Sequence, residues 1–274
     1  MSQISVNDIT SLDGKSGPVI SGITTVSSTG YMMVPAGDTR TRIVLPNENI
    51  VTDGLVLYLD AGKAESFGGD GTTWRDLSGE NNNGTLTNGV GFTEDYGGSL
   101  IFDGVDDYID FTSEPNLNGK SFSAGCWFKT TDADMRLIQN ASTGAFGTKT
   151  GFQISVVDNT FGNTAVTNSS GNSVAFGSVS STPYIDGNWH FICLTFNTTT
   201  GRAELYLDGN FSGFGINSGL IGANMNGVGL EIGRANSSFQ YLTGNISNAF
   251  MYNKALSAAE VLQNYNATKY RYEN

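Results

Sequence analysis

Apolar and polar residues alternate in short runs along most of the chain, with the period of two that is typical of half-buried β-strands. The clearest run is Phe122–Lys129, in which every second residue is apolar. This pattern predicts a strand with one core-facing side, formed by Phe122, Ala124, Cys126 and Phe128.

Similar runs recur at short intervals between residues 54 and 252, and tight-turn dipeptides such as Thr200-Gly201 and Asp208-Gly209 separate some of them. Closely spaced short strands are typical of a β-sandwich or barrel. The runs predict strands at Gly54–Asp60, Ser99–Asp103, Asp107–Phe111, Gly151–Val157, Ser173–Phe176, Trp189–Asn197, Ala203–Leu207, Gly229–Gly233 and Gly244–Tyr252.

One helix is predicted near the C-terminus, from Ala258 to about Tyr265. Ser257 and Glu260 have the spacing of a capping box, in which each side chain binds the other residue's backbone N–H. Leu256 and Val261 are placed to form the hydrophobic staple that accompanies it. A helix this short is unstable alone, so we expect it to pack against the sandwich.

The first 50 residues differ in composition, being rich in Ser, Thr, Val, Ile and Gly, with Tyr31 as their one large aromatic residue. They contain short β-like pieces at Ile4–Ile9, Val19–Val26 and Tyr31–Val34. Such a segment buries little apolar surface by itself. We therefore predict an extended, β-rich arm over residues 1–50 that gains order by docking on another surface, and a single sandwich domain over residues 51–274.

Charge restricts the partners of this 274-residue chain. Its formal net charge is −12, so phosphate backbones and anionic membrane surfaces are poor partners. We expect no nucleic acid and no membrane insertion, because no apolar stretch approaches the length that spans a bilayer. The first residues lack the basic and apolar regions of a secretory signal, so we expect synthesis in a cytoplasm.

The two cysteines, Cys126 and Cys193, are too far apart in sequence for a typical metal motif. Each lies in an apolar run. Buried free thiols fit cytoplasmic synthesis, and a disulfide between paired strands is the alternative.

Several blocks in order resemble the concanavalin A-like, laminin G-like jelly rolls. Each block is weak alone, but the combination is specific. They are Gly54–Asp60, Trp74–Gly79, Asn83–Leu86, Ser99–Ile109 (SLIFDGVDDYI), Phe122–Phe128, Asn188–Phe196, Ala203–Gly209 and Gly244–Ser257. The resemblance implies an all-β fold: a two-sheet antiparallel jelly-roll sandwich with a short C-terminal helix.

The resemblance also implies a Ca²⁺ site, since many laminin G-like domains hold this ion with Asp carboxylates and backbone carbonyls. The candidate ligands here are Asp60, Asp103, Asp106 and Asp107. The alternative is that Asp103 and Asp106 shape a turn through hydrogen bonds to the backbone. Where the family often has acidic residues in its last strand, this chain has Ser247 and Asn248.

A lectin site needs an aromatic platform and planar polar groups on loops. Two loops offer such residues: Phe239, Gln240 and Tyr241 in one, and Asn168 and Asn172 in the other. Trp74 falls in a structural block of the family, so we assign it to the core.

We expect no enzymatic activity. Glucanases of this fold need two carboxylates at i and i+4 on one strand, and the predicted strands carry Glu204 and Glu231 singly. His190 matches the structural Trp-His pair of the family, which favours a structural role over a catalytic one.

The arm is similar to the leaders of structural proteins in tailed bacteriophages, notably those of marine cyanobacteria, through Ile4–Ile9, Ile23–Gly30 and Met33–Asp38. This resemblance implies a virion structural protein, anchored to other virion proteins through residues 1–50. We expect a homo-oligomer, with a trimer as one form, whose sandwich binds host-surface glycans or decorates the particle. The alternative is a free lectin-like protein that binds carbohydrate without a particle.

Overall fold

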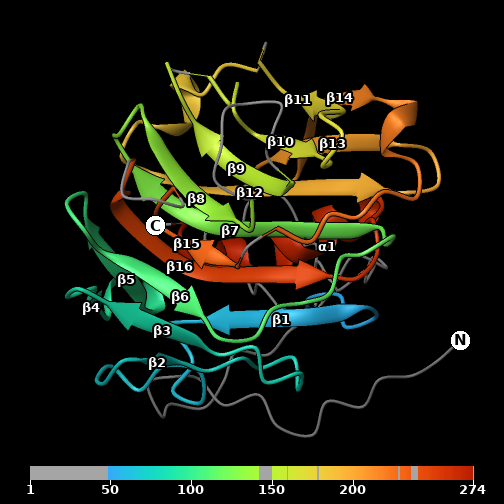
Figure 1. Ribbon diagram of the computed structural model, residues 1–274. Coiled ribbons are helices and arrows are strands. Elements are labelled where there is room, and N and C mark those ends of the chain that lie inside the picture. Colours follow the sequence, from blue (N-terminus) through green and yellow to red (C-terminus); the bar gives the residue numbers. More distant parts are fainter. Residues whose placement is uncertain are drawn as a thin grey trace, which may run out of the picture. The chain divides into compact units, whose positions relative to one another are not determined.

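Two antiparallel β-sheets lie face to face in a computed structural model (Figure 1), which describes residues 49–141, 150–158, 160–177, 179–227, 229–235 and 240–273. The predicted two-sheet sandwich with a short C-terminal helix is confirmed. The described residues belong to one compact unit, Asn49–Asn274. The predicted arm at 1–50 lies outside them except for its last two residues.

The first sheet has eight strands, with β16 (Thr243–Tyr252) near its middle. β16 pairs with β7 along one side, and on its other side with β5 over its first half and β1 over its second. The other strands are β1 (Leu55–Asp60), β4 (Gly91–Thr93), β5 (Ser99–Asp103), β7 (Phe122–Thr130), β12 (Trp189–Asn197), β13 (Arg202–Leu207) and β14 (Asn210–Ile216).

The second sheet also has eight strands, in the order β11-β10-β9-β8-β15-β6-β3-β2. Six strands were not predicted: β2, β3, β8 and β10 of this sheet, and β4 and β14 of the first sheet. Most of them are short and lack strong alternation. The second-sheet strands are β2 (Thr73–Trp74), β3 (Gly84–Thr87), β6 (Tyr108–Phe111), β8 (Met135–Gln139), β9 (Gly151–Val156), β10 (Ala165–Thr167), β11 (Ser173–Ala175) and β15 (Glu231–Ile232).

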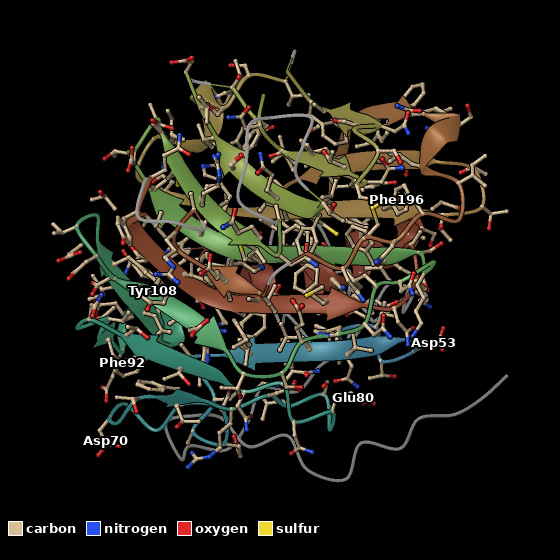
Figure 2. The ribbon with its side chains drawn as sticks, in the orientation of Figure 1. Asp53, Asp70, Glu80, Phe92, Tyr108 and Phe196 are labelled. Atoms are coloured by element: carbon tan, nitrogen blue, oxygen red, sulfur yellow. The ribbon has the colours of Figure 1, made fainter. Side chains whose placement is uncertain are left out.

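The main core fills the space between the sheets. All four predicted core residues of β7 are fully buried there, and the ring of Phe122 contacts those of Phe152 of β9 and Phe196 of β12. Trp74 is fully buried in the same cluster, as predicted. Figure 2 shows this contrast between interior and periphery: Phe196 lies in the core, while Asp53, Asp70 and Glu80 are exposed on loops.

A second apolar layer covers the outer face of the first sheet. It packs helix α1 (Ala258–Thr268) against side chains that include Trp127, Phe191 and Phe250. The capping box of Ser257 and Glu260 is present, as predicted. Short 3₁₀ turns lie at η1 (Asp95–Gly97), η2 (Thr182–Tyr184), η3 (Ser218–Leu220) and η4 (Lys269–Arg271).

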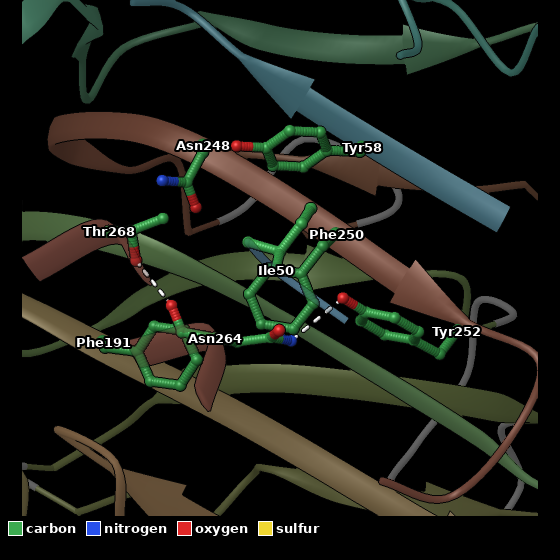
Figure 3. Close-up of a pocket in the computed structure, with 8 residues that line it drawn as sticks. All are labelled: Ile50, Tyr58, Phe191, Asn248, Phe250, Tyr252, Asn264 and Thr268. Atoms are coloured by element: carbon green, nitrogen blue, oxygen red, sulfur yellow. Dashed lines mark hydrogen bonds between the residues drawn. The ribbon is translucent and has the colours of Figure 1, made fainter. Parts of the chain in front are cut away.

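The helix runs one turn further than predicted, because its end is tied to the sheet. Trp127 Nε1 donates to Thr268 Oγ1 at 2.7 Å, and Asn264 Nδ2 donates to the Tyr252 hydroxyl at 3.0 Å. A small cavity lies at this contact (Figure 3), with Asn248 and Tyr58 in its lining. It holds about 10 Å³, room for one water at most, and is no ligand site.

The two cysteines are free, because they lie on opposite faces of the first sheet. Cys126 points into the main core, whereas Cys193, on the neighbouring strand, belongs to the layer under the helix. Burial raises the pKa of both thiols. The sequence left free thiols and a disulfide as alternatives, and the structure has buried, unreactive thiols.

A buried ion pair ties the C-terminal tail to the first sheet. Arg271 Nη1 donates to Asp60 Oδ1 at 2.7 Å, and Arg271 Nη2 also donates to the carbonyls of Gly97 and Gly98. The Tyr58 hydroxyl donates to the second oxygen of Asp60 at 2.9 Å. Both charged side chains are at least nine-tenths buried. Each has therefore lost most of its hydration, and the opposite charge of the other compensates for that loss.

Replacing Arg271 by Met should destabilise the protein by about 3–5 kcal/mol, because it leaves the Asp60 carboxylate buried without its cation. Urea unfolding followed by tryptophan fluorescence measures the change. Lys269→Met is the matched control, since Lys269 is more exposed and its oxygen partner on Glu273 is 3.8 Å away. It should cost well under about 1 kcal/mol; equal losses in the two variants would show that the ion pair has no special role.

Candidate functional site

The three neighbouring candidate metal ligands lie in the turn where the chain crosses from one sheet to the other. This acidic turn, Asp103–Asp107, joins the end of β5 in the first sheet to β6 in the second. Gly104 has a φ of +79°, and a Cβ there would lie 2.1 Å from Thr243 Oγ1. Only glycine therefore fits this position of the turn.

Side chains of the acidic turn bind its own backbone, as the turn interpretation predicts. Asp103 Oδ1 accepts hydrogen bonds from the N–H groups of Val105 at 2.8 Å and Asp106 at 3.4 Å. Asp107 Oδ2 accepts from the Asp103 N–H at 3.1 Å. These bonds hold three carboxylates of like charge together in one short segment.

The same carboxylates also suit a hard cation. One oxygen from each of Asp103, Asp106 and Asp107 lies within 4.8 Å of the others. Asp107 is 3% exposed, and its Oδ1 has no hydrogen-bond partner. Burial raises the pKa of Asp107, and the hydrogen bond from Asp103 opposes that effect only in part. A buried carboxylate oxygen without a donor is the kind of ligand that Ca²⁺ accepts.

The fourth candidate ligand, Asp60, lies apart from this cluster. Its oxygens contact Arg271, Tyr58 and the Gly62 N–H, and it is not among the three residues that lie within ligand distance of one another. Asp60 on β1 instead belongs to the buried ion pair with Arg271 that is described above.

The predicted sugar loops lie in two separate environments. Gln240 donates to Asp134, and Tyr241 hydrogen-bonds Arg234, whose guanidinium stacks 3.4 Å from the ring centroid of Tyr108. Phe239 lies outside the described residues. The loop thus borders the outer face of the second sheet, near Tyr108 in Figure 2.

The other two sugar candidates hold their own loop together. Asn168 accepts from the N–H groups of Ser170 and Asn172, both at 3.0 Å, and donates to the Gly219 carbonyl at 2.8 Å. Asn172 is half-buried against Gly219. The structure does not show these residues contacting Gln240 or Tyr241 in the described part of the chain.

A groove that the sequence analysis did not predict lies at one edge of the sandwich. It has a volume of about 400 Å³ and lies between β14 at the edge of the first sheet and β11 at the edge of the second. In Figure 1 these strands lie together at the top, opposite β2, β3 and β4. We call it the edge groove; it is lined by Phe176, Val179, Tyr184, Leu207, Ser212 and Phe214, among others.

The sequence does carry a signal for β14, the edge strand beside this groove. Asn210–Ile216 follows the Asp208-Gly209 turn and contains Phe211, Phe214 and Ile216, which are more than half exposed. Exposed aromatic residues on a strand that begins directly after a hairpin turn indicate an edge with a surface role. Gly213 and Gly215 interrupt the pattern of this run, so the sequence analysis did not predict the strand.

The carboxylates Glu204 and Glu231, considered for glycoside hydrolysis, are each held by a neighbouring cation. Glu204 binds Arg202 at 2.6 Å and accepts from the Tyr206 hydroxyl, while Glu231 binds Arg234 and Gln139. They lie on different sheets, so they do not form a catalytic pair.

His190 has two carboxylate partners. Its Nδ1 lies 2.9 Å from Asp208 and its Nε2 lies 3.1 Å from Asp186. A neutral imidazole has one N–H, so only the protonated ring donates to both. Burial by itself lowers the pKa of His190, but the bonds and charges of the two carboxylates outweigh it, and the net shift is upward. These contacts agree with the structural role expected for this residue.

Among the described residues, no helix combines the length and the apolar character needed to span a bilayer.

Comparison with known families decides the classification. The model of the concanavalin A-like lectin/glucanases superfamily matches residues 103–262, more than half of the chain. The chain belongs to this superfamily. The match begins in the acidic turn and ends within α1, so it includes β6 to β16 and leaves out β1 to β4. No curated protein sequence matches the chain at a significant level.

Solved structures with this superfamily fold include the binding domains of clostridial toxins. Paraclostridial mosquitocidal protein 1 has a binding domain with a TM-score of 0.60 and 18% identity, covering 79% of this chain and 52% of that one. The binding domain of botulinum neurotoxin DC, solved with rat synaptotagmin II, has a TM-score of 0.59 and 15% identity, covering 80% of this chain and 52% of that one. The ligand binding domain of botulinum neurotoxin serotype D, solved with N-acetylneuraminic acid, has a TM-score of 0.58 and 17% identity, covering 78% of this chain and 51% of that one. The chain thus spans about half the length of these domains, and the likeness is one of fold.

Raising the pH from about 6 to about 8 should lower the unfolding temperature through loss of the His190 proton. The raised pKa means that this stabilisation is full below the ordinary value of about 6.5 and is lost as pH rises through the folded-state pKa. The pKa of Asp186 is lowered, so Asp186 titrates well below this range. Calorimetry of the protein and of His190→Gln measures the effect; the variant should show a weaker pH dependence, and an unchanged one would refute the assignment.

Proposed function

We propose that this chain is a non-enzymatic, lectin-like virion protein whose sandwich binds host-surface glycans with the aid of Ca²⁺ at the acidic turn. The observation that carries the proposal is the orphaned, buried Oδ1 of Asp107 beside the oxygens of Asp103 and Asp106. Membership of the superfamily supports a binding role. The toxin domains support it through their shared fold, since one was solved with synaptotagmin II and another with N-acetylneuraminic acid.

The chemistry of the acidic turn agrees with this role. Asp103, Asp106 and Asp107 would hold the ion, which when bound would supply a positive centre for sugar hydroxyl oxygens. Asp103 and Asp106 are exposed, so the outer side of such a site is open to a ligand. Backbone N–H groups of the turn donate to the Asp103 and Asp107 carboxylates, so these two side chains need little reorganisation to bind an ion.

The arm provides the attachment in this proposal. The chain enters the sandwich beside α1, where Gln263 donates to the Asn49 carbonyl and Asn264 accepts from the Val51 N–H, both at 2.8 Å. Residues 1–50 would bind other virion proteins and other copies of the chain by strand addition, with a trimer as one arrangement. A net charge of −12 suits a glycan ligand better than a phosphate-bearing one.

Calcium should stabilise the protein and support its binding to envelope polysaccharide from marine cyanobacteria. At a free Ca²⁺ concentration ten times the Kd, the gain in unfolding free energy is about 1.4 kcal/mol. Asp107→Asn should abolish this gain and weaken polysaccharide binding, while its amide oxygen can still accept from the Asp103 N–H.

Asp110→Asn is the matched control, because Asp110 is exposed on β6 and lies outside the three-residue cluster. Thermal unfolding and surface plasmon resonance, each with Ca²⁺ and with a chelator, measure the two effects. Equal unfolding temperatures with and without Ca²⁺ would remove the ion from the proposal. Absence of binding to any tested glycan would overturn the lectin role.

Deleting residues 1–48 should leave a folded sandwich that no longer assembles or enters particles. Asn49, Ile50 and Val51 are kept because they contact α1 or the layer beneath it. Light scattering compares the mass of the full chain with that of the deletion variant, and circular dichroism checks the fold. A full chain that is already monomeric would favour the free lectin-like protein instead.

A further inference from the structure

A buried arginine on the outer face of the second sheet has no acidic partner among the described residues. Arg136 lies on β8 between Met135 and Leu137, which point into the main core, so its own side chain points to the outer face. Arg136 is only 4% exposed, and its Nε and Nη1 groups make no hydrogen bond to the described part of the chain. Burial lowers the pKa of Arg136 to about 10, so the guanidinium is still charged at neutral pH.

The carboxylates of this face do not neutralise that charge. Asp134 opposes the pKa shift of Arg136 electrostatically, but the two side chains form no ion pair. Asp134 is exposed and accepts a hydrogen bond from Gln240 instead. Glu231 is bound by Arg234. A buried charge without compensation is unfavourable, and native structures rarely contain one unless an ion or a ligand completes the site.

A hydroxyl without a partner lies directly opposite Arg136. β8 and β9 are antiparallel neighbours in the second sheet (Figure 1), and Arg136 pairs with Ser155 in their register. Residues paired in this way point to the same face, with their Cβ atoms about 5 Å apart. Ser155 is fully buried, and its Oγ makes no hydrogen bond to any described residue.

The backbone of Ser155, by contrast, is fully used. Thr164 Oγ1 accepts from the Ser155 N–H and donates to the Ser155 carbonyl, both at 3.0 Å. The hydroxyl of Ser155 is therefore not needed by the surrounding strands. A register shift after Arg136 makes Leu137 a bulged residue, and bulges are common beside functional sites.

Unused donors are concentrated at this one pair. Nine buried side-chain atoms lack a hydrogen-bond partner within the described ranges, and three of them belong to Arg136 and Ser155. All three can donate a hydrogen bond. A water molecule would satisfy the hydroxyl but leave the positive charge uncompensated, whereas an oxyanion would satisfy both. Guanidinium groups bind oxyanions with several hydrogen bonds at once.

The burial of the two side chains restricts the size of such an anion. Ser155 has no contact with solvent, and Arg136 has little. A polymer or a peptide cannot reach the hydroxyl without moving the strands or the chain that covers them. A small inorganic ion fits this restriction.

We infer that Arg136 and Ser155 form a binding site for one small oxyanion of the sulfate or phosphate type, which is held as a structural ion on the outer face of β8 and β9. The anion accepts hydrogen bonds from the guanidinium and the hydroxyl and compensates the buried charge. The inference does not rest on the proposed glycan binding, because the site shares no residue with the acidic turn.

The test follows thermal unfolding of the full chain while sodium sulfate replaces sodium chloride at constant ionic strength, in excess chelator. At ten times its Kd, sulfate should raise the unfolding temperature by about 3–6 °C, and the gain should saturate. Titration calorimetry gives the Kd. Ser155→Ala should weaken sulfate binding about tenfold, the size expected for a lost hydrogen bond to a charged group.

Arg136→Met separates an anion site from an ordinary structural arginine. The variant should lose the saturable response to sulfate, because it has no cation to offer. In sulfate-free and phosphate-free buffer it should be at least as stable as the unmodified chain, because it removes an uncompensated buried charge and keeps the apolar stem. A structural arginine with partners inside the protein would give the opposite result.

Arg75→Met is the matched control. Arg75 is exposed, and its replacement changes the net charge by the same amount. Sulfate also stabilises proteins in general through exclusion from their surface. That general effect does not saturate at low concentration, and it should be equal in both arginine variants. Crystals grown with selenate, which resembles sulfate and has a strong anomalous signal, should show a peak beside Arg136 and Ser155.

A saturable sulfate response that is kept in Arg75→Met and lost in Arg136→Met supports the inference. Equal responses in the unmodified chain and in Arg136→Met would overturn it. So would a large loss of stability in Arg136→Met without any oxyanion. Neither of these results affects calcium-dependent glycan binding, so the proposed lectin role is tested separately.

Discussion

The first sheet must be buried on both of its faces, and the rest of the structure follows from that constraint. On β7, β12 and β16, apolar residues occupy both alternating positions, so neither face can be left to water. The second sheet covers one face, and helix α1 with the C-terminal tail covers the other. Within the outer layer, a Cβ at Gly125 would lie 2.6 Å from the ring of Phe250, its cross-strand partner on β16.

Helix α1 and the C-terminal tail form a small cover on this outer face, so specific contacts stabilise it. Trp127 stacks on Tyr265 at 5.5 Å and on Tyr272 at 4.2 Å, which joins the helix and the tail in one aromatic cluster. Arg271 fixes the tail at Asp60, and Ser247 accepts a hydrogen bond from the Tyr272 hydroxyl at 2.6 Å. Ser247 and Asn248, which depart from the acidic pattern of the superfamily, thus lie on the strand that the tail covers.

The candidate binding features of the sandwich lie where its two sheets are connected or end. The chain crosses from β5 to β6 through a turn that concentrates three carboxylates. At one edge the two sheets end with β14 and β11, and a groove lined by uncharged residues lies between them.

Local residues determined the class of the fold. Alternation placed the four inward residues of Phe122–Lys129 correctly, and the capping box set the start of α1, because both signals depend on neighbouring positions alone. The same is true of the turn at Asp103 and Gly104, whose side-chain and backbone bonds span a few residues. Strands of two to four residues, such as β2 and β10, were missed because they contain too few positions for a period to show.

Contacts between distant residues were decided only by the tertiary structure. Nothing near Asp60 indicates that it pairs with Arg271, more than two hundred positions away, and this pairing separates it from the other candidate ligands. The edge groove likewise needs η2, β11 and β14 to meet in space. Sequence by itself therefore determined the strands, the helix and the acidic turn, where the interacting groups are neighbours in the chain. The tertiary structure decided which carboxylates share a site and where an open groove remains, because sheet order brings those groups together.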